Sequence, residues 1–304
     1  MIKKLFYRLT NKTKYLEYKA QITKKRRLSV FKNGLEDEIS RIHNIIINNK
    51  EIAFLHSGHL GDIICSLPVI QKLSTTHRCS LYIRTNEPFP HKHRFLKSSK
   101  DLVFLNDSGV EKLLPLLKCQ PFLNKVEKYK DQNIDINLDF FRSLPINFND
   151  DFIRYFSLLT GVYPDLSLPS LFVKENKQFE NKVIIIRSTK RKNIFINYRF
   201  LIDYKDLIFI GLKDEYLDLK KEVSNLEFYE CKNFLEMAEI IKSGKFFLGN
   251  MSLGFALAEI LKVPRLLENF PEYNVVNPHG PNAYDFYFQD HFEKLFKDLY
   301  NLKN

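Results

Sequence analysis

The sequence contains little cysteine and no long apolar run. No apolar stretch approaches the ~18 residues that a membrane-spanning helix needs, and no apolar segment of the signal-peptide type follows the first lysines. The four cysteines are scattered, with neither a Cys-x-x-Cys pair nor the spacing of metal ligands. This pattern argues against a membrane-embedded protein, a disulfide framework and a cysteine-bound metal. We therefore expect a cytoplasmic protein with reduced thiols.

Acidic residues are almost missing from the beginning of the chain. Residues 1–34 carry eleven lysines and arginines against one acid, Glu17, so they hold +10 of the formal net charge of +11. The remaining body is close to neutral, whereas a protein that grips nucleic acid more often spreads basic residues over a folded face. The charge predicts a basic leader on an enzyme-like body, and nucleic-acid binding through the leader is the least favoured interpretation.

The start of this leader is predicted to be an amphipathic helix. Ile2, Leu5, Phe6 and Leu9 recur at helical spacing, with basic residues on the other faces. Such a helix can lie in the interface of an anionic membrane. The alternative is a solvated basic helix that packs on the body or is partly disordered. Apolar residues at helical spacing in 35–50 predict a second helix, docked on the first domain.

Residues 54–73 are the most informative segment. An apolar run at 52–55 predicts a strand, which feeds a Gly58-x-x-Gly61-Asp62 turn and then a helix with regular apolar spacing. Glycines allow a ligand to approach the backbone closely, and ligands of open α/β sheets bind outside the carboxyl ends of strands. The loop residues expected near a ligand are Ser57, Gly58 and Gly61.

Strands and helices are predicted to alternate through the rest of the chain. The expected strands are 79–83, 102–105, 182–187, 207–210, 226–229, 246–248 and 265–267, and the expected helices are 110–117, 152–159, 216–223, 234–243 and 253–261. This alternation predicts an α/β protein with two Rossmann-like, doubly wound domains. The predicted boundaries are a basic helical leader at 1–50, a first domain at 51–172 and a second at 173–304.

The motif Gly58-x-x-Gly61-Asp62-x-x-x-x-x-Pro68 resembles the opening motif of glycosyltransferase family 9, the ADP-heptose lipopolysaccharide heptosyltransferases. That resemblance implies the GT-B fold, in which two Rossmann-like domains face a cleft. It also implies an inverting transfer that needs no metal, with Asp62 as the general base and a nucleoside diphosphate as the leaving group. The first domain would hold the acceptor and the second the nucleotide-sugar donor.

The position of Asp62 suits a base on physical grounds as well. A carboxylate at a helix start lies near the positive end of the helix dipole, which favours its ionised form. Proton transfer then requires only that an acceptor hydroxyl comes within hydrogen-bonding reach. The alternative is that Asp62 simply caps the helix, since aspartate is a favoured N-cap residue.

The second half offers looser matches to the same family. Arg187 and Lys190 follow a buried strand where the family has a basic residue near the donor phosphates, and arginine and lysine can neutralise a leaving diphosphate. For Arg191 and Lys192, a solvated basic loop is an equal alternative. Gly211 and Glu215 resemble the family's glycine-to-glutamate segment, whose glutamate is associated with the nucleoside ribose; an ordinary acid at a helix start is the alternative.

Another match is a turn at a helix N-terminus that can hold a phosphate, formed by Asn250 and Ser252. The family usually has an aspartate where this chain has Met251, and a histidine where this chain has alanine. The resemblance therefore does not imply ADP-heptose as the donor. Glu268 and His279, predicted at the same edge, are further donor-side candidates, although a lone loop histidine is more often structural.

One further segment of the first half combines acids with an arginine. Asp135, Asn137, Asp139 and Arg142 are predicted either to line the acceptor site or to form a surface cluster of salt bridges.

The leading hypothesis is an inverting, metal-independent glycosyltransferase. Its expected partners are a nucleotide-sugar donor, a cell-surface polysaccharide or lipid-linked acceptor, and an anionic membrane reached through residues 1–34. We expect no cofactor and a location in the cytoplasm, peripheral on the inner face of the cytoplasmic membrane. The alternative from another class is a non-catalytic GT-B relative that binds a sugar or nucleotide or acts as a scaffold.

Overall fold

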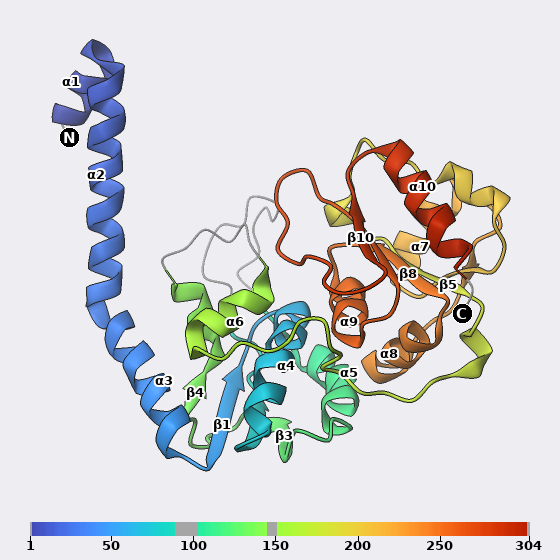
Figure 1. Cartoon of the computed structure of the whole chain (residues 1–304), viewed down its shortest axis with the longest axis horizontal. Coiled ribbons are helices and arrows are strands. Elements are labelled where there is room, and N and C mark those ends of the chain that lie inside the picture. The colour runs from blue at the N-terminus through green and yellow to red at the C-terminus, as the bar shows by residue number, and fades with distance from the viewer. Residues whose placement is uncertain (1, 89–102, 145–150, 303–304) are drawn as a thin grey trace.

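The computed structural model describes residues 2–88, 103–144 and 151–302 and has two parallel β-sheets, each flanked by helices (Figure 1). The first sheet has the strand order β3-β2-β1-β4. Its strands are β1 (Glu51–His56), β2 (Arg78–Ile83), β3 (Lys125–Lys128) and β4 (Ile136–Asn137). Its helices include α4 (Leu60–Ser74), α5 (Asp107–Lys118) and α6 (Phe152–Thr160).

The second sheet has the order β10-β9-β8-β5-β6-β7, again with every pair parallel. Its strands are β5 (Val183–Ile186), β6 (Leu207–Phe209), β7 (Glu227–Phe228), β8 (Phe246–Asn250), β9 (Arg265–Glu268) and β10 (Ala283–Phe286). Its helices are α7 (Lys213–Lys220), α8 (Phe234–Ser243), α9 (Leu253–Leu261) and α10 (Gln289–Tyr300). Four consecutive apolar residues form β5 because both faces of a parallel sheet are buried.

Each sheet reverses its winding direction at its first strand. The chain passes from β1 to β2 and β3 on one side and then places β4 on the other side of β1. In the same way β6 and β7 lie on one side of β5, and β8 lies on the other. Ligands of open α/β sheets bind at such reversal points, outside the carboxyl ends of the strands. The fold therefore predicts that a ligand binds at the loops that follow β1, β4, β5 and β8.

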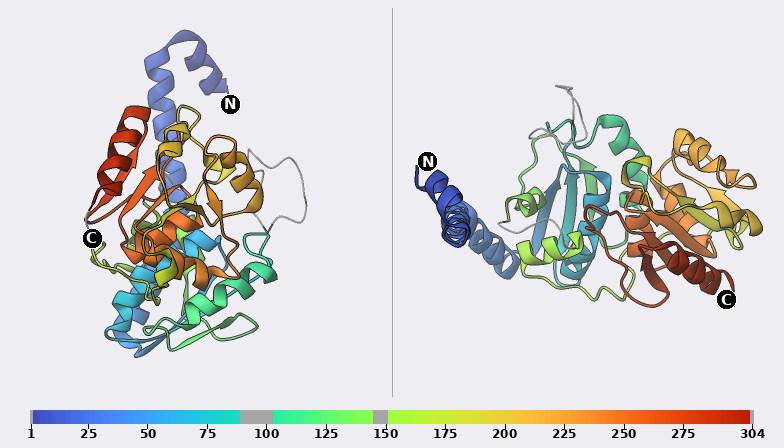
Figure 2. Two further views of the ribbon diagram at one scale, coloured as in Figure 1. Left: turned by 90° about the vertical axis from the view of Figure 1, so that its right-hand side faces the viewer. Right: turned by 90° about the horizontal axis from the view of Figure 1, so that it is seen from above.

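The two halves pack against each other through helices. Helix α4 contacts α9 and α5 contacts α8, and one apolar cluster runs from Ile63 and Leu67 in the first half to Phe255 in the second. A second cluster covers the opposite face of the second sheet, where Phe292 and Phe296 of α10 pack on it. The view from above in Figure 2 shows the two halves side by side.

The leader is helical, as predicted. It consists of α1 (Ile2–Thr10), α2 (Lys12–Val30), a π-helical turn (Phe31–Leu35) and α3 (Glu36–Asn48). Helix α3 docks on the first half, where Ile42 is fully buried and Arg41 donates to the Asp135 carbonyl (2.8 Å). No helix in the described part of the chain is both long and apolar enough to cross a membrane.

Most elements agree with the sequence predictions. Helices α8 and α9 have the predicted bounds, and α6 ends at Gly161 in the left-handed conformation (φ 72°), where glycine avoids strain. The strand predicted at 102–105 is wrong in its described part, because Val103 makes only an isolated bridge with Pro88; residue 102 lies outside the described residues. The predicted domain boundary between 172 and 173 stays a prediction.

Sequence patterns missed two edge strands, β3 and β10, and two helices, α2 and α10. Strand β3 reads Lys-Val-Glu-Lys, with too few apolar residues to signal a strand, and β10 is a second edge strand with exposed side chains. Helix α2 has its apolar residues spread around the helix and so gives no helical periodicity.

Candidate active site

The loop after β1 brings Asp62 to the carboxyl edge of the first sheet. Helix α4 starts at Leu60, and His59, not Asp62, holds the N-cap position. The interpretation of Asp62 as an N-cap is therefore wrong: it lies in the first helical turn, with 8% of its side chain exposed. The partial positive charge of the helix start favours its carboxylate there.

The two glycines of the loop have different roles. A Cβ on Gly58 would lie 1.7 Å from Nη2 of Arg142, so that glycine makes room for the guanidinium. A Cβ on Gly61 would meet nothing within 4 Å. Gly58 therefore serves the protein's own packing, whereas Gly61 leaves open space one residue from Asp62.

Arg142 connects two carboxylates that are far apart in the sequence. Its Nη2 donates to Asp62 Oδ2 (2.8 Å) and its Nη1 donates to Asp139 Oδ1 (2.5 Å). The guanidinium carbon lies 4.4 Å from the ring centroids of both Phe104 and Phe141. Of the two carboxylate oxygens of Asp62, only Oδ2 has a hydrogen-bond partner among the described residues. The arrangement fixes the Asp62 carboxylate while leaving Oδ1 to accept from a ligand.

Asp139 anchors this cluster to the end of β1. It accepts hydrogen bonds from the Ser57 hydroxyl and from Ser57 N (3.0 Å), and His56 Nδ1 lies 3.2 Å from it. Burial alone would raise the pKa of Asp139, but His56, the charge of Arg142 and the Ser57 hydrogen bond together lower that pKa. Asp139 therefore stays ionised and holds Arg142 in place.

The sequence left open whether residues 135–142 line the acceptor site or form a surface cluster of salt bridges, and the structure separates these residues into two groups. Asp139 and Arg142 lie at the candidate site. Asp135 instead accepts a hydrogen bond from Ala53 N (2.8 Å), and Asn137 accepts one from Asp139 N (3.0 Å). Both of these support the edge where the short strand β4 pairs with β1.

Arg187 and Glu268, predicted to face the donor, instead bind each other in the interior. Arg187 Nε lies 2.7 Å from Glu268 Oε2, Nη2 lies 3.0 Å from Oε1, and the two side chains are 2% and 0% exposed. Glu268 also accepts from Tyr198 Oη (2.8 Å) and from Asn193 N (2.5 Å). The prediction that they face the donor is corrected: the two residues form a buried ion pair that holds the loop after β5. Buried opposite charges need such full pairing, so neither side chain is free to bind a donor.

Asn250 also acts within the protein. Its side chain is fully buried, accepts from Ser188 N (2.8 Å) and donates to the carbonyls of Ser188 (2.7 Å) and Arg191 (2.9 Å). Both the oxygen and the nitrogen of the side-chain amide form these hydrogen bonds. Asn250 therefore shapes the loop of residues 188–191 and has no polar group left to bind a nucleotide-sugar donor. The predicted direct contact is replaced by a positioning role.

Several other predicted donor residues remain accessible at this edge. Lys190 is exposed, and Ser252 holds the N-cap position of α9, where its hydroxyl donates to the Asn250 carbonyl (3.0 Å). Glu215, in the first turn of α7, accepts from Thr189 N (3.3 Å). Gly211 follows β6, where a Cβ would lie 2.8 Å from the ring of Phe209. Lys192 forms an ion pair with Asp218.

His59 shows that the loops of the two halves face each other. Burial lowers the pKa of His59 most, and the charges of Arg142 and Arg191 lower it further. The charge of Asp62 acts in the opposite direction and raises that pKa. Arg142 belongs to the first half and Arg191 to the second, where its Nη1 donates to the Met251 carbonyl (3.2 Å). Sequence reasoning gave His59 no role and Arg191 only even weight, because their proximity arises from tertiary packing.

His279, another predicted donor residue, binds the first half instead. Its Nε2 lies 2.5 Å from Asp151 Oδ2, and Asp151 caps α6 by accepting from Ile153 N (3.0 Å). The pKa of His279 is raised, chiefly by this hydrogen bond and also by the charges of Asp151 and Glu259, while burial and Lys262 lower it. The pair is a contact between the halves, and Asp151 gave no sequence signal beyond a loop.

We expect this contact to make stability depend on pH. The pKa of His279 is higher in the folded state than its ordinary value of 6.5, so its contribution is fully present below pH 6.5. It is lost as the pH rises through the folded value. His279→Ala should lower the free energy of unfolding by about 1 kcal/mol at mildly acidic pH, a value reduced for the solvent exposure of the ring.

Denaturant unfolding across the pH range measures this difference. The matched control is His43→Gln on the exposed face of α3, a histidine outside the contact between the halves. A His279→Ala difference that is constant with pH would contradict the assignment.

In the described residues, no group of three or more histidine, cysteine, aspartate or glutamate side chains is placed to hold a metal ion. The expectation of metal-independent chemistry stays a prediction.

Comparison with known proteins gives matches at the level of structure. No protein-family model matches the sequence, and no curated protein matches it significantly. The family 9 glycosyltransferase of Veillonella parvula is similar with a TM-score of 0.53 and 11% identity, over 84% of this chain and 90% of that one. ADP-heptose lipopolysaccharide heptosyltransferase II of E. coli gives 0.51 and 11%, over 82% and 98%.

An iron-containing dodecameric glycosyltransferase from enterotoxigenic E. coli gives a TM-score of 0.48 and 13% identity, over 79% of this chain and 62% of that one. At these identities the comparisons establish the fold. They confirm the fold class and the resemblance predicted from the sequence: the chain has the two-sheet α/β fold of the family 9 glycosyltransferases.

Proposed function

We propose that this protein is an inverting glycosyltransferase with Asp62 as its general base. The observation that carries the proposal is the placement of Asp62. It lies at the reversal point of the first sheet, beside the open space at Gly61, with one oxygen held by Arg142. A carboxylate that is fixed and open on one side has the geometry of a base. The shared fold supports the same activity.

The proposed reaction is a single displacement. An acceptor hydroxyl gives its proton to Asp62 Oδ1 as its oxygen forms a bond to the anomeric carbon of the donor sugar. The bond between that carbon and the phosphate oxygen breaks, and the nucleoside diphosphate leaves with the electron pair. Attack opposite the leaving group inverts the anomeric configuration.

The donor would bind to the loops after β5 and β8. Lys190, Arg191 and the N-terminus of α9 at Ser252 would neutralise the charge that builds on the leaving diphosphate, so we propose that no metal is required. Glu215 is the candidate partner of the ribose hydroxyls. Because the charges of Arg191 and Asp62 both act on the pKa of His59, donor phosphates bound at Arg191 would lie near the base.

The acceptor would approach from the first half. We propose a cell-surface polysaccharide or a lipid-linked glycan, since the base requires only a sugar hydroxyl and the first-half loops provide polar groups around it.

One observation favours a non-catalytic relative as the second candidate. Met251 is 2% exposed and occupies the turn where the family usually has an aspartate, so this turn offers a donor fewer polar groups. In that case the protein would bind a nucleotide or sugar without transferring it.

The experiment that separates the two combines binding and turnover. A thermal-shift screen over ADP, GDP, UDP and CMP sugars should identify the donor, because a ligand that binds the folded state raises its melting temperature. The donor is then incubated with candidate glycan acceptors, and release of the nucleoside phosphate is measured. A thermal shift without release for every acceptor would favour the non-catalytic candidate, and no shift with any sugar would overturn both.

Gly58→Ala is expected to reduce transfer more than stability. The new Cβ would lie 1.7 Å from Nη2 of Arg142 and 2.9 Å from Cε1 of the buried His56, so both side chains must shift and Asp62 would lose its partner. Misplacement of a reacting group by about 1 Å costs up to about 10²-fold in rate. We expect a modestly lower melting temperature and, as an order of magnitude, a kcat lower by about 10- to 100-fold.

Gly61→Ala is the control for stability alone, since its Cβ would meet no protein atom within 4 Å and Arg142 would stay in place; a change in its transfer rate would report on the open space beside Asp62. Undiminished transfer by Gly58→Ala would show that the Arg142 contact does not position the base.

A further inference from the structure

Residues 2–30 form a helical hairpin that stands apart from both sheets (Figures 1 and 2). The chain turns at Asn11, whose N–H donates to the Tyr7 carbonyl (2.9 Å) and whose Oδ1 accepts from Lys14 N (2.9 Å). The rings of Tyr7 and Tyr18 pack edge to face with 5.9 Å between their centroids. These contacts join α1 and α2 into one unit.

Helix α1 presents an apolar face to solvent. Leu5, Phe6 and Leu9 are 61%, 60% and 77% exposed, and the two leucines lie one turn apart on the same face. The contact with α2 uses Tyr7 instead. An amphipathic helix normally buries such a face, so this one requires a partner outside the described fold.

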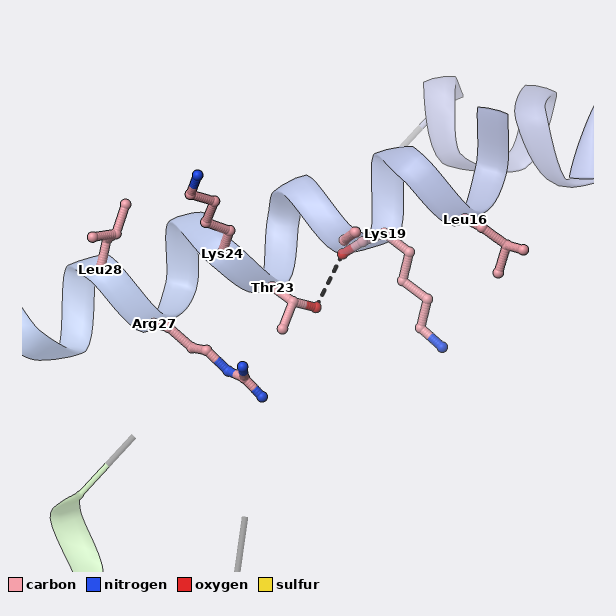
Figure 3. Close-up of a pocket in the computed structure, with 7 residues that line it drawn as sticks. Leu16, Lys19, Thr23, Lys24, Arg27 and Leu28 are labelled. Carbon is pink, nitrogen blue, oxygen red and sulfur yellow. Dashed lines mark hydrogen bonds between the residues drawn. The ribbon is translucent and has the colours of Figure 1, made fainter. Parts of the chain in front are cut away.

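Helix α2 adds a shallow groove on its own surface, lined by both apolar and basic side chains of that helix (Figure 3). Its lining residues are Leu16, Lys19, Ala20, Thr23, Lys24, Arg27 and Leu28. The whole helix carries seven basic residues and one acid. Within the part of the chain that the structure describes, none of these basic side chains forms an ion pair. This groove lies on the leader, far along the chain from Asp62.

The positive charge of the hairpin distinguishes between the partners that its apolar and basic surface could bind. A second copy of the hairpin would bring two strongly positive helices together, which like charges oppose. A nucleic acid would satisfy the lysines and arginines but leave the leucines of α1 exposed. An anionic bilayer satisfies both, with phosphates for the basic groups and acyl chains for the apolar face.

We propose that the α1–α2 hairpin docks this protein on an anionic membrane surface. Helix α1 lies in the interface with Leu5, Phe6 and Leu9 toward the acyl chains. Helix α2 contributes the electrostatic attraction through basic groups such as Lys24 and Arg27.

The orientation gives the docking a purpose. In Figure 1 the hairpin extends in the direction in which β1 points, the edge of the first sheet at which Asp62 lies. Docking would therefore hold that edge near lipid-linked glycans; this role of the docking rests on the proposed function, whereas the membrane binding itself does not.

Vesicle sedimentation with the full chain tests the docking. The wild type should bind vesicles of phosphatidylcholine and phosphatidylglycerol, bind pure phosphatidylcholine weakly, and release at high salt. Lys24→Gln, Arg26→Gln and Arg27→Gln together should weaken binding about 100-fold. Leu5→Asp with Leu9→Asp should weaken it at least about ten-fold.

The matched control removes the same charge from the body. Lys112, Lys118 and Lys297 are exposed, and their triple glutamine variant should bind vesicles as the wild type does. Equal losses in the two triple variants would overturn the proposal, as would wild-type binding by the aspartate variant.

Two further outcomes would also overturn it. One is salt-dependent binding to duplex DNA, without vesicle binding, that the basic variant loses and the aspartate variant keeps. The other is a dimer in sedimentation equilibrium that the aspartate variant dissociates. Because none of these assays measures transfer, their results stand whether or not the protein is a glycosyltransferase.

Discussion

Replacing Asp62 with asparagine is expected to lower kcat for sugar transfer by about 10²- to 10⁴-fold, the usual contribution of a general base. Asparagine keeps the shape of the side chain and an oxygen that can accept from Arg142 Nη2, but it cannot take up the acceptor proton. The donor binds mainly to the second half in the proposed arrangement, so its thermal shift should be kept. Release of the nucleoside diphosphate measures the loss.

The matched control is Asp135→Asn. That carboxylate belongs to the same sheet and accepts a hydrogen bond from Ala53 N, but it lies outside the candidate site. It should alter stability slightly and transfer little. Transfer by Asp62→Asn at the wild-type rate would remove Asp62 as the base, and equal losses in both variants would indicate damage to the sheet.

Glu268→Gln is expected to have the largest effect on stability, lowering the free energy of unfolding by about 3–5 kcal/mol. The glutamine is nearly isosteric but removes the negative charge opposite Arg187, which is 2% exposed and cannot recover hydration. Two hydrogen bonds to the same carboxylate, from Tyr198 and Asn193, would weaken as well. Chemical denaturation measures the change.

An exposed ion pair of the same sheet supplies the comparison. Glu227 lies 2.9 Å from Lys182 and is 58% exposed, so Glu227→Gln should cost less than about 1 kcal/mol. If the two variants lost similar stability, Arg187 would not depend on Glu268. Because the pair holds the loop that carries Lys190 and Arg191, we also expect Glu268→Gln to weaken donor binding.

Local sequence patterns predicted the main elements well. The run from β1 through the glycine loop to α4, and the bounds of α8 and α9, follow from apolar periodicity, because burial against a sheet imposes that periodicity on each segment. Most of the missed elements lack such burial, although α10 was missed despite its buried Phe292 and Phe296. Strands β3 and β10 lie at sheet edges, and α2 stands outside both cores.

The residues of the candidate site were predicted less well than the fold. Asp62 was identified from its motif, but Arg142 lies 80 positions later, and nothing in either segment specifies their contact. Arg187 and Glu268 were correctly expected at one edge of the sheet, yet they turn inward to each other. A sequence pattern gives the strand end from which a side chain starts, not the direction it takes.

The sequence by itself determined which segments form strands and helices, that the halves repeat one α/β plan, and that the leader is basic. Each of these depends on residues close together along the chain. Only the tertiary structure decided which charges meet: Asp62 with Arg142, Arg187 with Glu268, and Asp151 with His279. The physical reason is that an ion pair depends on a few ångströms between side chains, and those distances are fixed by how the sheets and helices pack.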